Sequence, residues 1–126
     1  MSNQYVPGTC NIGPEEIALR RRAGHVGLAV TAGLAAALLR SGVHPAWRLA
    51  LALPAAGAAS GYLQARQRFC ANYGFRGLYN FERRGHEQPV PVAGARDEDR
   101  RRSLQIAATS AAIGAGVALL AVAAGR

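Results

Sequence analysis

The chain has 126 residues, half of them hydrophobic, and a formal net charge of +8 at pH 7. A soluble helical domain of this size would show polar faces along its helices. Three long stretches are instead apolar on all sides, which argues against a soluble bundle and favours a small membrane protein. These stretches are Ala23 to Leu39, Ala46 to Leu63 and Leu104 to Ala124.

The chain starts with a polar tail, residues 1–13, which we expect to lie along the inner face of the membrane. The first membrane helix is predicted at about residues 14–40. Pro14 suits the first position of a helix, and Glu15 and Glu16 favour the positive end of the helix dipole. More than twenty residues precede the apolar run, so we do not expect this helix to be a cleaved signal peptide.

The second membrane helix is predicted at about residues 46–73, with Trp47 at its outer end. Only a short turn separates it from the first, so these two helices should form an antiparallel hairpin. A cytoplasmic loop, residues 74–96, follows as an amphipathic and irregular segment on the inner face. The third membrane helix is predicted at about residues 98–124, opening with the acidic residues that a helix N-terminus prefers. The predicted fold is therefore all-α, with three transmembrane helices in one integral membrane domain, residues 1–126.

The arginines predict the orientation of these helices. All fifteen basic residues are arginine, and only Arg40, Arg48 and Arg126 fall on one side of the predicted membrane. Positively charged flanks stay in the cytoplasm. The N-terminus and the long loop should therefore be cytoplasmic, and the C-terminus should lie outside.

Arginines and aromatic residues at the predicted helix ends are typical of the headgroup layer, where anionic lipids would be their partners. Basic residues mixed with aromatic ones can also bind nucleic acid, but a position between two membrane spans disfavours that interpretation. The expected interface residues are Arg20, Arg21, Arg22, Trp47, Arg66, Arg68, Phe69, Tyr73, Arg100, Arg101 and Arg102.

Small residues recur at helical spacing in all three stretches. Helices in lipid associate through close packing of such residues, so these positions are candidates for contact between helices or with another protein. Gly57 and Gly61 form a Gly-x-x-x-Gly motif that could also support a homo-oligomer. The candidate packing residues are Gly27, Thr31, Gly57, Gly61, Gly114 and Gly116.

Residues for catalysis are sparse. The three histidines form no helical pair, and the chain has no Cys-x-x-Cys and no phosphate loop, so the sequence predicts no enzyme, cofactor or metal centre. Cys10 and Cys70 should lie on the same inner face, each near arginines that favour a thiolate. They are either a redox or metal-binding thiol pair or two reduced cysteines packed beneath the tail.

Two segments resemble small uncharacterised integral membrane proteins of GC-rich bacteria. The first is Cys10-Asn11-Ile12-Gly13-Pro14-Glu15-Glu16-Ile17 with Arg20-Arg21-Arg22, and the second is Gln64-Ala65-Arg66 with Phe69-Cys70. The resemblance implies a bacterial cytoplasmic membrane and a cysteine-bearing element on its inner face. It implies no activity.

Three functions are compatible with this pattern. We favour a non-catalytic accessory subunit of a larger bacterial membrane complex, such as a respiratory, photosynthetic or transport complex. The first alternative is a self-associating protein that forms a small pore. The second is a thiol-dependent redox or metal-binding membrane protein that uses Cys10 and Cys70.

Overall fold

The structure is a computed structural model that describes residues 5–83 and 85–124. Within these residues the chain is mostly helical, so the predicted all-α fold is confirmed. The elements in chain order are α1 (Pro14–Arg40), the 3-10 helix η1 (Pro45–Leu51), α2 (Ala52–Gln67), α3 (Ala71–Arg76), β1 (Leu78–Tyr79), β2 (Gln88–Pro89) and α4 (Ala93–Ala124).

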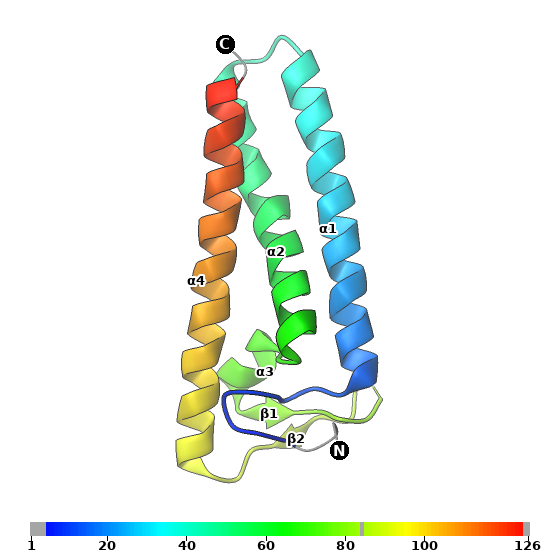
Figure 1. Cartoon of the computed structure of the whole chain (residues 1–126), viewed down its shortest axis with the longest axis vertical. Coiled ribbons are helices and arrows are strands. Elements are labelled where there is room, and N and C mark those ends of the chain that lie inside the picture. Colours follow the sequence, from blue (N-terminus) through cyan, green and yellow to red (C-terminus); the bar gives the residue numbers. More distant parts are fainter. Residues whose placement is uncertain (1–4, 84, 125–126) are drawn as a thin grey trace.

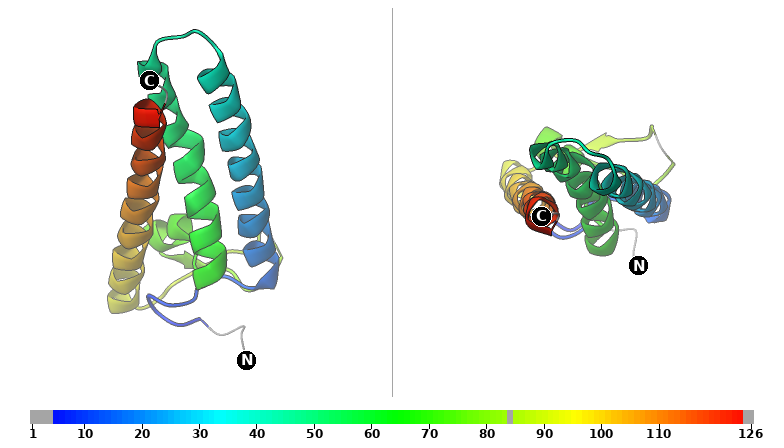
Figure 2. Two further views of the ribbon diagram at one scale, coloured as in Figure 1. Left: turned by 45° about the horizontal axis from the view of Figure 1, so that its top comes forward. Right: turned by 90° about the horizontal axis from the view of Figure 1, so that it is seen from above.

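Three long helices lie side by side, with α2 between α1 and α4 (Figure 1). The chain rises along α1, turns and descends along α2, so these two helices are antiparallel. Residues 5–13, 68–83 and 85–92 form a cap at one end of the bundle, as the two views of Figure 2 also show. In the cap, β1 and β2 pair antiparallel, Leu78 opposite Pro89. The C-terminal end of α4 lies at the opposite end of the bundle.

Two helices, α1 and α4, are each long and apolar enough to cross a membrane. Their 27 and 32 residues extend about 40 and 48 Å, more than the hydrocarbon core of about 30 Å. Only 6% of the residues in the apolar window of α1, and 22% of those in α4, are buried in the structure. A core helix of a soluble protein would be mostly buried, so both helices expose their apolar surface.

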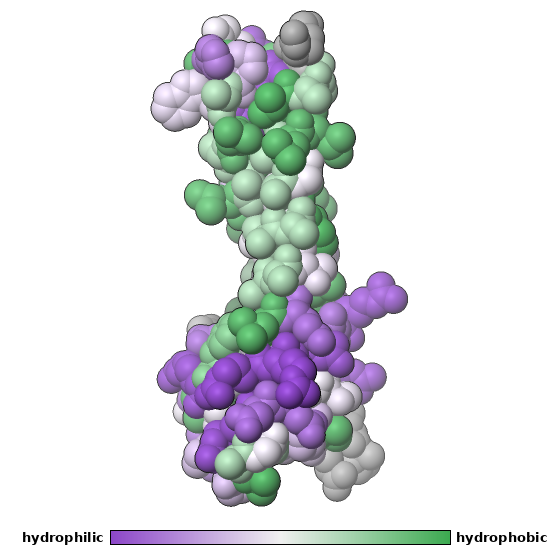
Figure 3. All heavy atoms as spheres, turned by 90° about the vertical axis from the view of Figure 1, so that its left-hand side faces the viewer, coloured by the Kyte–Doolittle hydropathy of each residue, from purple (hydrophilic) through white to green (hydrophobic). Residues whose placement is uncertain are grey.

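The surface is divided along the long axis into an apolar half and a polar half (Figure 3). The polar half is the capped end. Large aliphatic side chains are exposed along all three long helices, including Leu53 at 80% and Leu120 at 72%. Water would make so much exposed apolar surface costly, whereas lipid would not.

The second predicted helix, residues 46–73, is wrong in its extent. Its first turns form η1, and the α-helix ends at Gln67. Arg68 then adopts a left-handed conformation, with φ of 54°. The break is stabilised because the Gln64 side-chain oxygen accepts the backbone N–H of Ala71 at 2.9 Å, replacing a helical hydrogen bond.

Two further predictions also need correction. They are the loop at residues 74–96 and the start of the third helix at residue 98. The segment contains the end of α3 and both strands, and α4 already begins at Ala93. The described part of the tail packs into the cap. Ile12 is completely buried in the cap, where it contacts Cys70 and Tyr73.

Glycines set the close approach of α1 to α2. A Cβ atom on Gly61 would lie 2.7 Å from the Gly24 nitrogen and 2.8 Å from the Arg20 carbonyl oxygen. A Cβ on Gly27 would lie 2.9 Å from the backbone of Ala58. Because real Cβ atoms do not approach this closely, larger residues at these positions would push the helices apart.

The other predicted packing residues divide into two groups. Gly114 packs against Ala52 and Ala56, and so joins α4 to α2. Thr31 donates its hydroxyl to the Gly27 carbonyl of its own helix at 2.7 Å. No other part of the described chain comes within 4 Å of a Cβ placed on Gly57 or Gly116, so packing of these two positions against another protein stays a prediction.

Candidate functional site

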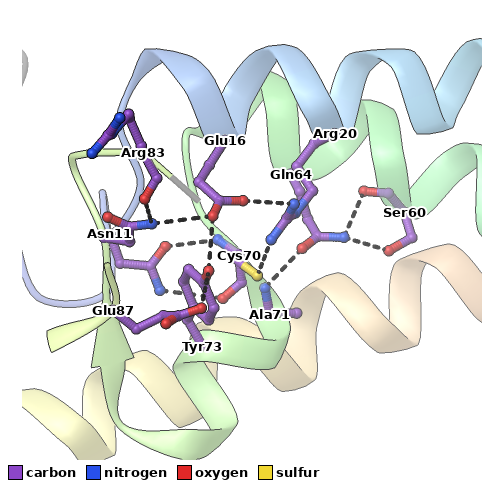
Figure 4. Close-up of polar contacts among 11 residues, drawn as sticks. Asn11, Glu16, Arg20, Ser60, Gln64, Cys70, Ala71, Tyr73, Arg83 and Glu87 are labelled. Carbon is purple, nitrogen blue, oxygen red and sulfur yellow. Dashed lines mark hydrogen bonds and ion pairs between the residues drawn. The ribbon is translucent and has the colours of Figure 1, made fainter. Parts of the chain in front are cut away.

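A buried polar cluster lies in the cap, where α1, α2 and α3 meet (Figure 4). It contains Asn11 and Asn80, which are both 0% exposed, and Glu16, which is 2% exposed. Burying such groups is costly unless each has a hydrogen-bond partner. The structure supplies these partners from three parts of the chain that are distant in sequence. The cluster therefore holds these parts together in the cap.

Asn11 joins the N-terminal segment to the break after α2. Its side-chain oxygen accepts the Cys70 N–H at 2.7 Å, and its amide donates to the Cys70 carbonyl at 3.2 Å. Its backbone N–H donates to the Arg68 carbonyl at 3.1 Å. Asn11 therefore satisfies backbone groups that the helix break would otherwise leave unpaired.

Glu16 is the anionic centre of the cluster. One carboxylate oxygen forms an ion pair with Arg20 at 2.9 Å. The other accepts the Tyr73 hydroxyl at 2.8 Å and the Asn80 amide at 3.2 Å. Tyr73 also donates to Glu87 at 3.1 Å. With both oxygens bonded, Glu16 fastens α1 to α3 and to the segment after β1.

The two cysteines occupy different environments. Both are free thiols, with Cys70 buried and Cys10 half-buried. The Arg20 guanidinium donates to the Cys70 sulfur at 2.8 Å, whereas the Cys10 thiol contacts the Ile12 carbonyl at 3.7 Å. Burial raises the pKa of Cys10, and this outweighs the opposing effect of Arg68. Arg68 thus acts in the predicted direction, but its effect is smaller than that of burial.

A second polar contact fastens the N-terminal segment to α4. Asp99, which is 0% exposed, accepts the Tyr5 hydroxyl at 2.5 Å and the Gly8 N–H at 2.7 Å. Arg102 donates to the Gly8 carbonyl at 2.9 Å and to Gln67 at 3.1 Å. These bonds close the cap over the ends of α2 and α4.

The predicted interface residues are spread over several environments. The side chains of Arg21, Arg22, Arg66, Arg68, Arg100 and Arg101 are exposed, and Trp47 is 65% exposed. Arg20 and Arg102 take part in the polar bonds described above. Phe69 and Tyr73 are 0% and 6% exposed. Their predicted position among lipid headgroups is wrong, because both rings form the interior of the cap.

Arg48 at the opposite end of the bundle is buried, at 6% exposure. It donates to the Ala121 carbonyl at 2.9 Å. A guanidinium at this point compensates the negative end of the α4 dipole. Arg48 thus links η1 to the end of α4.

The chemistry of this site is dominated by structural hydrogen bonds. Within residues 5–83 and 85–124, no group of three or more His, Cys, Asp or Glu residues could hold a metal ion. A thiol pair that binds metal would need such further ligands. The carboxylates of Glu16 and Asp99 are occupied by donors from their own chain.

Two tyrosines predict the behaviour of the cap at alkaline pH. Burial, together with the hydroxyl's bond to a carboxylate, raises the pKa of Tyr73 and of Tyr5 above the ordinary value of 10.0. The folded cap therefore holds these protons more tightly than the unfolded chain does. The stability they contribute is complete below about pH 10 and declines as the pH rises beyond it. The chain has no lysine, and arginine stays charged, but burial also raises the pKa of the Cys10 thiol, which adds to the same decline.

We expect Tyr73→Phe to destabilise the cap by about 1.5–3 kcal/mol near pH 8, because hydrogen bonds to charged groups are lost. The variant should also lose less stability than the parent chain as the pH rises into the alkaline range. Chemical unfolding of the detergent-solubilised protein between about pH 8 and pH 11 measures both effects. Tyr79→Phe is the control at pH 8, since the Tyr79 ring stacks on Tyr5 without a hydroxyl bond to Glu16. Identical pH profiles for Tyr73→Phe and the parent chain would contradict the prediction.

Comparisons of the chain with protein-family models, with curated proteins and with solved structures find no significant match. The resemblance to small membrane proteins of GC-rich bacteria stays a prediction.

Several residues of the cluster were not recognised as site residues from the sequence. Glu16 and Arg20 stand four positions apart, the spacing of an ion pair on one helix face, so this contact could have been anticipated. Asn80 and Asp99 give no such indication. Each is buried only because a segment about 60 to 90 positions earlier in the sequence reaches it.

Proposed function

We propose that this protein is a non-catalytic accessory subunit of a larger bacterial membrane complex, such as a respiratory, photosynthetic or transport complex. In this proposal the chain crosses the cytoplasmic membrane three times. The cap lies at the cytoplasmic face, and the C-terminus lies outside.

The second crossing would consist of η1 and α2 together. The 16 residues of α2 alone extend about 24 Å, which is less than the hydrocarbon core. The seven residues of η1 add about 14 Å, since a 3-10 helix rises about 2 Å per residue. The combined length of about 38 Å matches α1, against which α2 packs.

The orientation is supported by the arginines of the cap and of the adjoining helix ends. Twelve of the fifteen arginines lie in the first turns of α1, in the last turn of α2, or between α2 and the apolar part of α4. Such a concentration is retained in the cytoplasm. The cap would then stand in water beneath the membrane.

One observation favours a protein partner over lipid alone. Gly116 opens onto the surface of the bundle with nothing of the described chain within 4 Å of a Cβ placed on it. A residue that only faces lipid gains nothing from being this small, whereas close approach of another helix requires it. Its position supports docking of a further subunit on α4.

Native purification tests the proposal. We expect the tagged protein, extracted in mild detergent, to elute with larger membrane proteins, and Gly116→Leu to reduce their yield. The control is Leu120→Ile on the same helix, a volume-conserving change at an exposed position. The proposal would be abandoned if the parent protein eluted alone at monomer size.

The same purification distinguishes the two alternatives. A single-species oligomer would favour a pore, but the Gly57 and Gly61 pair cannot form that interface intact, because Gly61 is occupied by α1. Bound metal or a reactive thiol pair would favour the thiol function. The observation that favours this second alternative is the contact between Arg20 and the Cys70 sulfur.

A further inference from the structure

Two hollows on the same side of α1 share a wall. The first, the polar hollow, has a volume of about 520 Å³ and is lined by Arg20, Tyr73, Arg76 and Glu87, among others. The second, the apolar groove, has a volume of about 580 Å³ and runs between α1 and α2. Leu19 lines both of them.

The two hollows lie along one stripe of α1. Glu16, Leu19, Ala23, Val26 and Val30 follow one another at intervals of three or four residues, the spacing of a single helix face. The polar hollow uses the start of this stripe and the apolar groove uses the rest. A ligand with a polar head and an apolar chain could therefore occupy both.

Their dimensions match one leaflet of a bilayer. From Leu19 to Val30 the helix rises about 16 Å, close to half of a hydrocarbon core of about 30 Å. From Glu16 to Leu19 and Arg20 it rises about 5 to 6 Å, comparable to a headgroup layer of about 5–8 Å. The apolar groove is thus as long as one acyl chain in its leaflet.

The charges of the polar hollow are balanced. Arg20 and Glu16 form an ion pair with each other, which leaves Arg76 and Glu87, both exposed, as the charged side chains at the surface of the hollow. Arg22, also exposed, lines the adjoining apolar groove. A backbone hydrogen bond, then the Tyr73 hydroxyl and also the charge of Arg76, lower the pKa of Glu87, so it is ionised at neutral pH. The arginines suit a lipid phosphate, and Glu87 suits a headgroup cation, which a purely anionic lipid lacks.

We propose that the polar hollow and the apolar groove together bind one phospholipid with an ethanolamine headgroup. Arg76 would contact its phosphate, Glu87 would accept hydrogen bonds from its primary ammonium, and one acyl chain would lie along the apolar groove. A choline headgroup has no N–H to donate, and a glycerol headgroup has no cation for Glu87. The inference rests on the membrane insertion proposed above.

Native mass spectrometry of the purified chain tests this inference. The protein is taken from detergent into bilayer discs holding equal amounts of phosphatidylethanolamine, phosphatidylglycerol and phosphatidylcholine with identical acyl chains. We expect one retained lipid per chain, with ethanolamine lipid preferred about tenfold over each competitor. Glu87→Gln should abolish that preference. Glu15→Gln, an exposed glutamate of α1 outside both hollows, is the control and should preserve it.

The apolar groove is tested separately. Ala23→Phe fills the groove from an exposed position, and should reduce the retained lipid without changing the headgroup preference of what remains. Equal retention of the three lipids by the parent chain, or equal preference in the Glu87→Gln and Glu15→Gln variants, would overturn the inference alone. A chain that stays soluble without detergent and retains no lipid would overturn the proposed function as well.

Discussion

Gly61→Leu is expected to separate α1 from α2. Even a Cβ at this position would lie 2.7 to 2.8 Å from backbone atoms of Gly24 and Arg20, which cannot move without shifting the whole helix. Overpacking of this kind costs about 1–3 kcal/mol and sometimes more. We expect the larger end of this range, because backbone rather than a flexible side chain is in the way. Unfolding of the micelle-bound protein by increasing SDS measures the loss.

Gly57→Leu is the matched control for this prediction. It places the same side chain one helical turn away in the same helix, where nothing of the described chain lies within 4 Å. We expect it to leave the stability of the isolated chain unchanged. Equal destabilisation by the two variants would show that the helix contact is not the one described.

Asn11→Ala is expected to open the cap. The variant leaves the buried N–H and C=O groups of Cys70 without their partners, and each unsatisfied buried group costs about 1–3 kcal/mol. The N-terminal segment and the break after α2 should then exchange backbone hydrogens faster together, while the far ends of α1 and α4 stay protected. Hydrogen exchange read by mass spectrometry on the detergent-solubilised protein resolves these regions.

Two further variants test the cause of this effect. Asn72→Ala removes an exposed amide from α3, and should leave exchange in the cap unchanged. Asn11→Asp keeps the acceptor for the Cys70 N–H but replaces the donor to the Cys70 carbonyl by a negative oxygen. It should therefore destabilise the cap, although aspartate has nearly the same shape as asparagine. A cap that is as protected in Asn11→Ala as in the parent chain would refute the assigned role.

The long helices could be predicted well from local sequence. Pro14 and the acidic residues after it marked the start of α1, and the short polar turn after Arg40 marked its end. The break after Gln67 could not be predicted in this way. Residues 64–73 have no breaking residue, and the helix stops because side chains, one of them 59 positions away in the sequence, take over its backbone hydrogen bonds.

The residues of the candidate site could likewise be predicted only in part from the sequence. Spacing alone does not distinguish Gly57 from Gly61. Only the position of α1 determines that Gly61 is packed against another helix and that Gly57 is open. Phe69 and Tyr73 are residue types typical of a membrane interface, but both are buried, and Ile12 of the N-terminal segment packs against Tyr73. Composition therefore predicts the helices, while long-range contacts determine which of their residues face inward.

The bonds between the N-terminal segment and Asp99 have a consequence for biogenesis. Tyr5 and its acceptor are separated by 94 positions, so at a ribosomal rate of about 5–20 residues per second the tail waits roughly 5–20 s for its partner. Synthesis of α1 and α2 would thus precede completion of the cap. A nascent polypeptide stalled before Asp99 should present residues 5–13 to added protease, and one released after it should protect them.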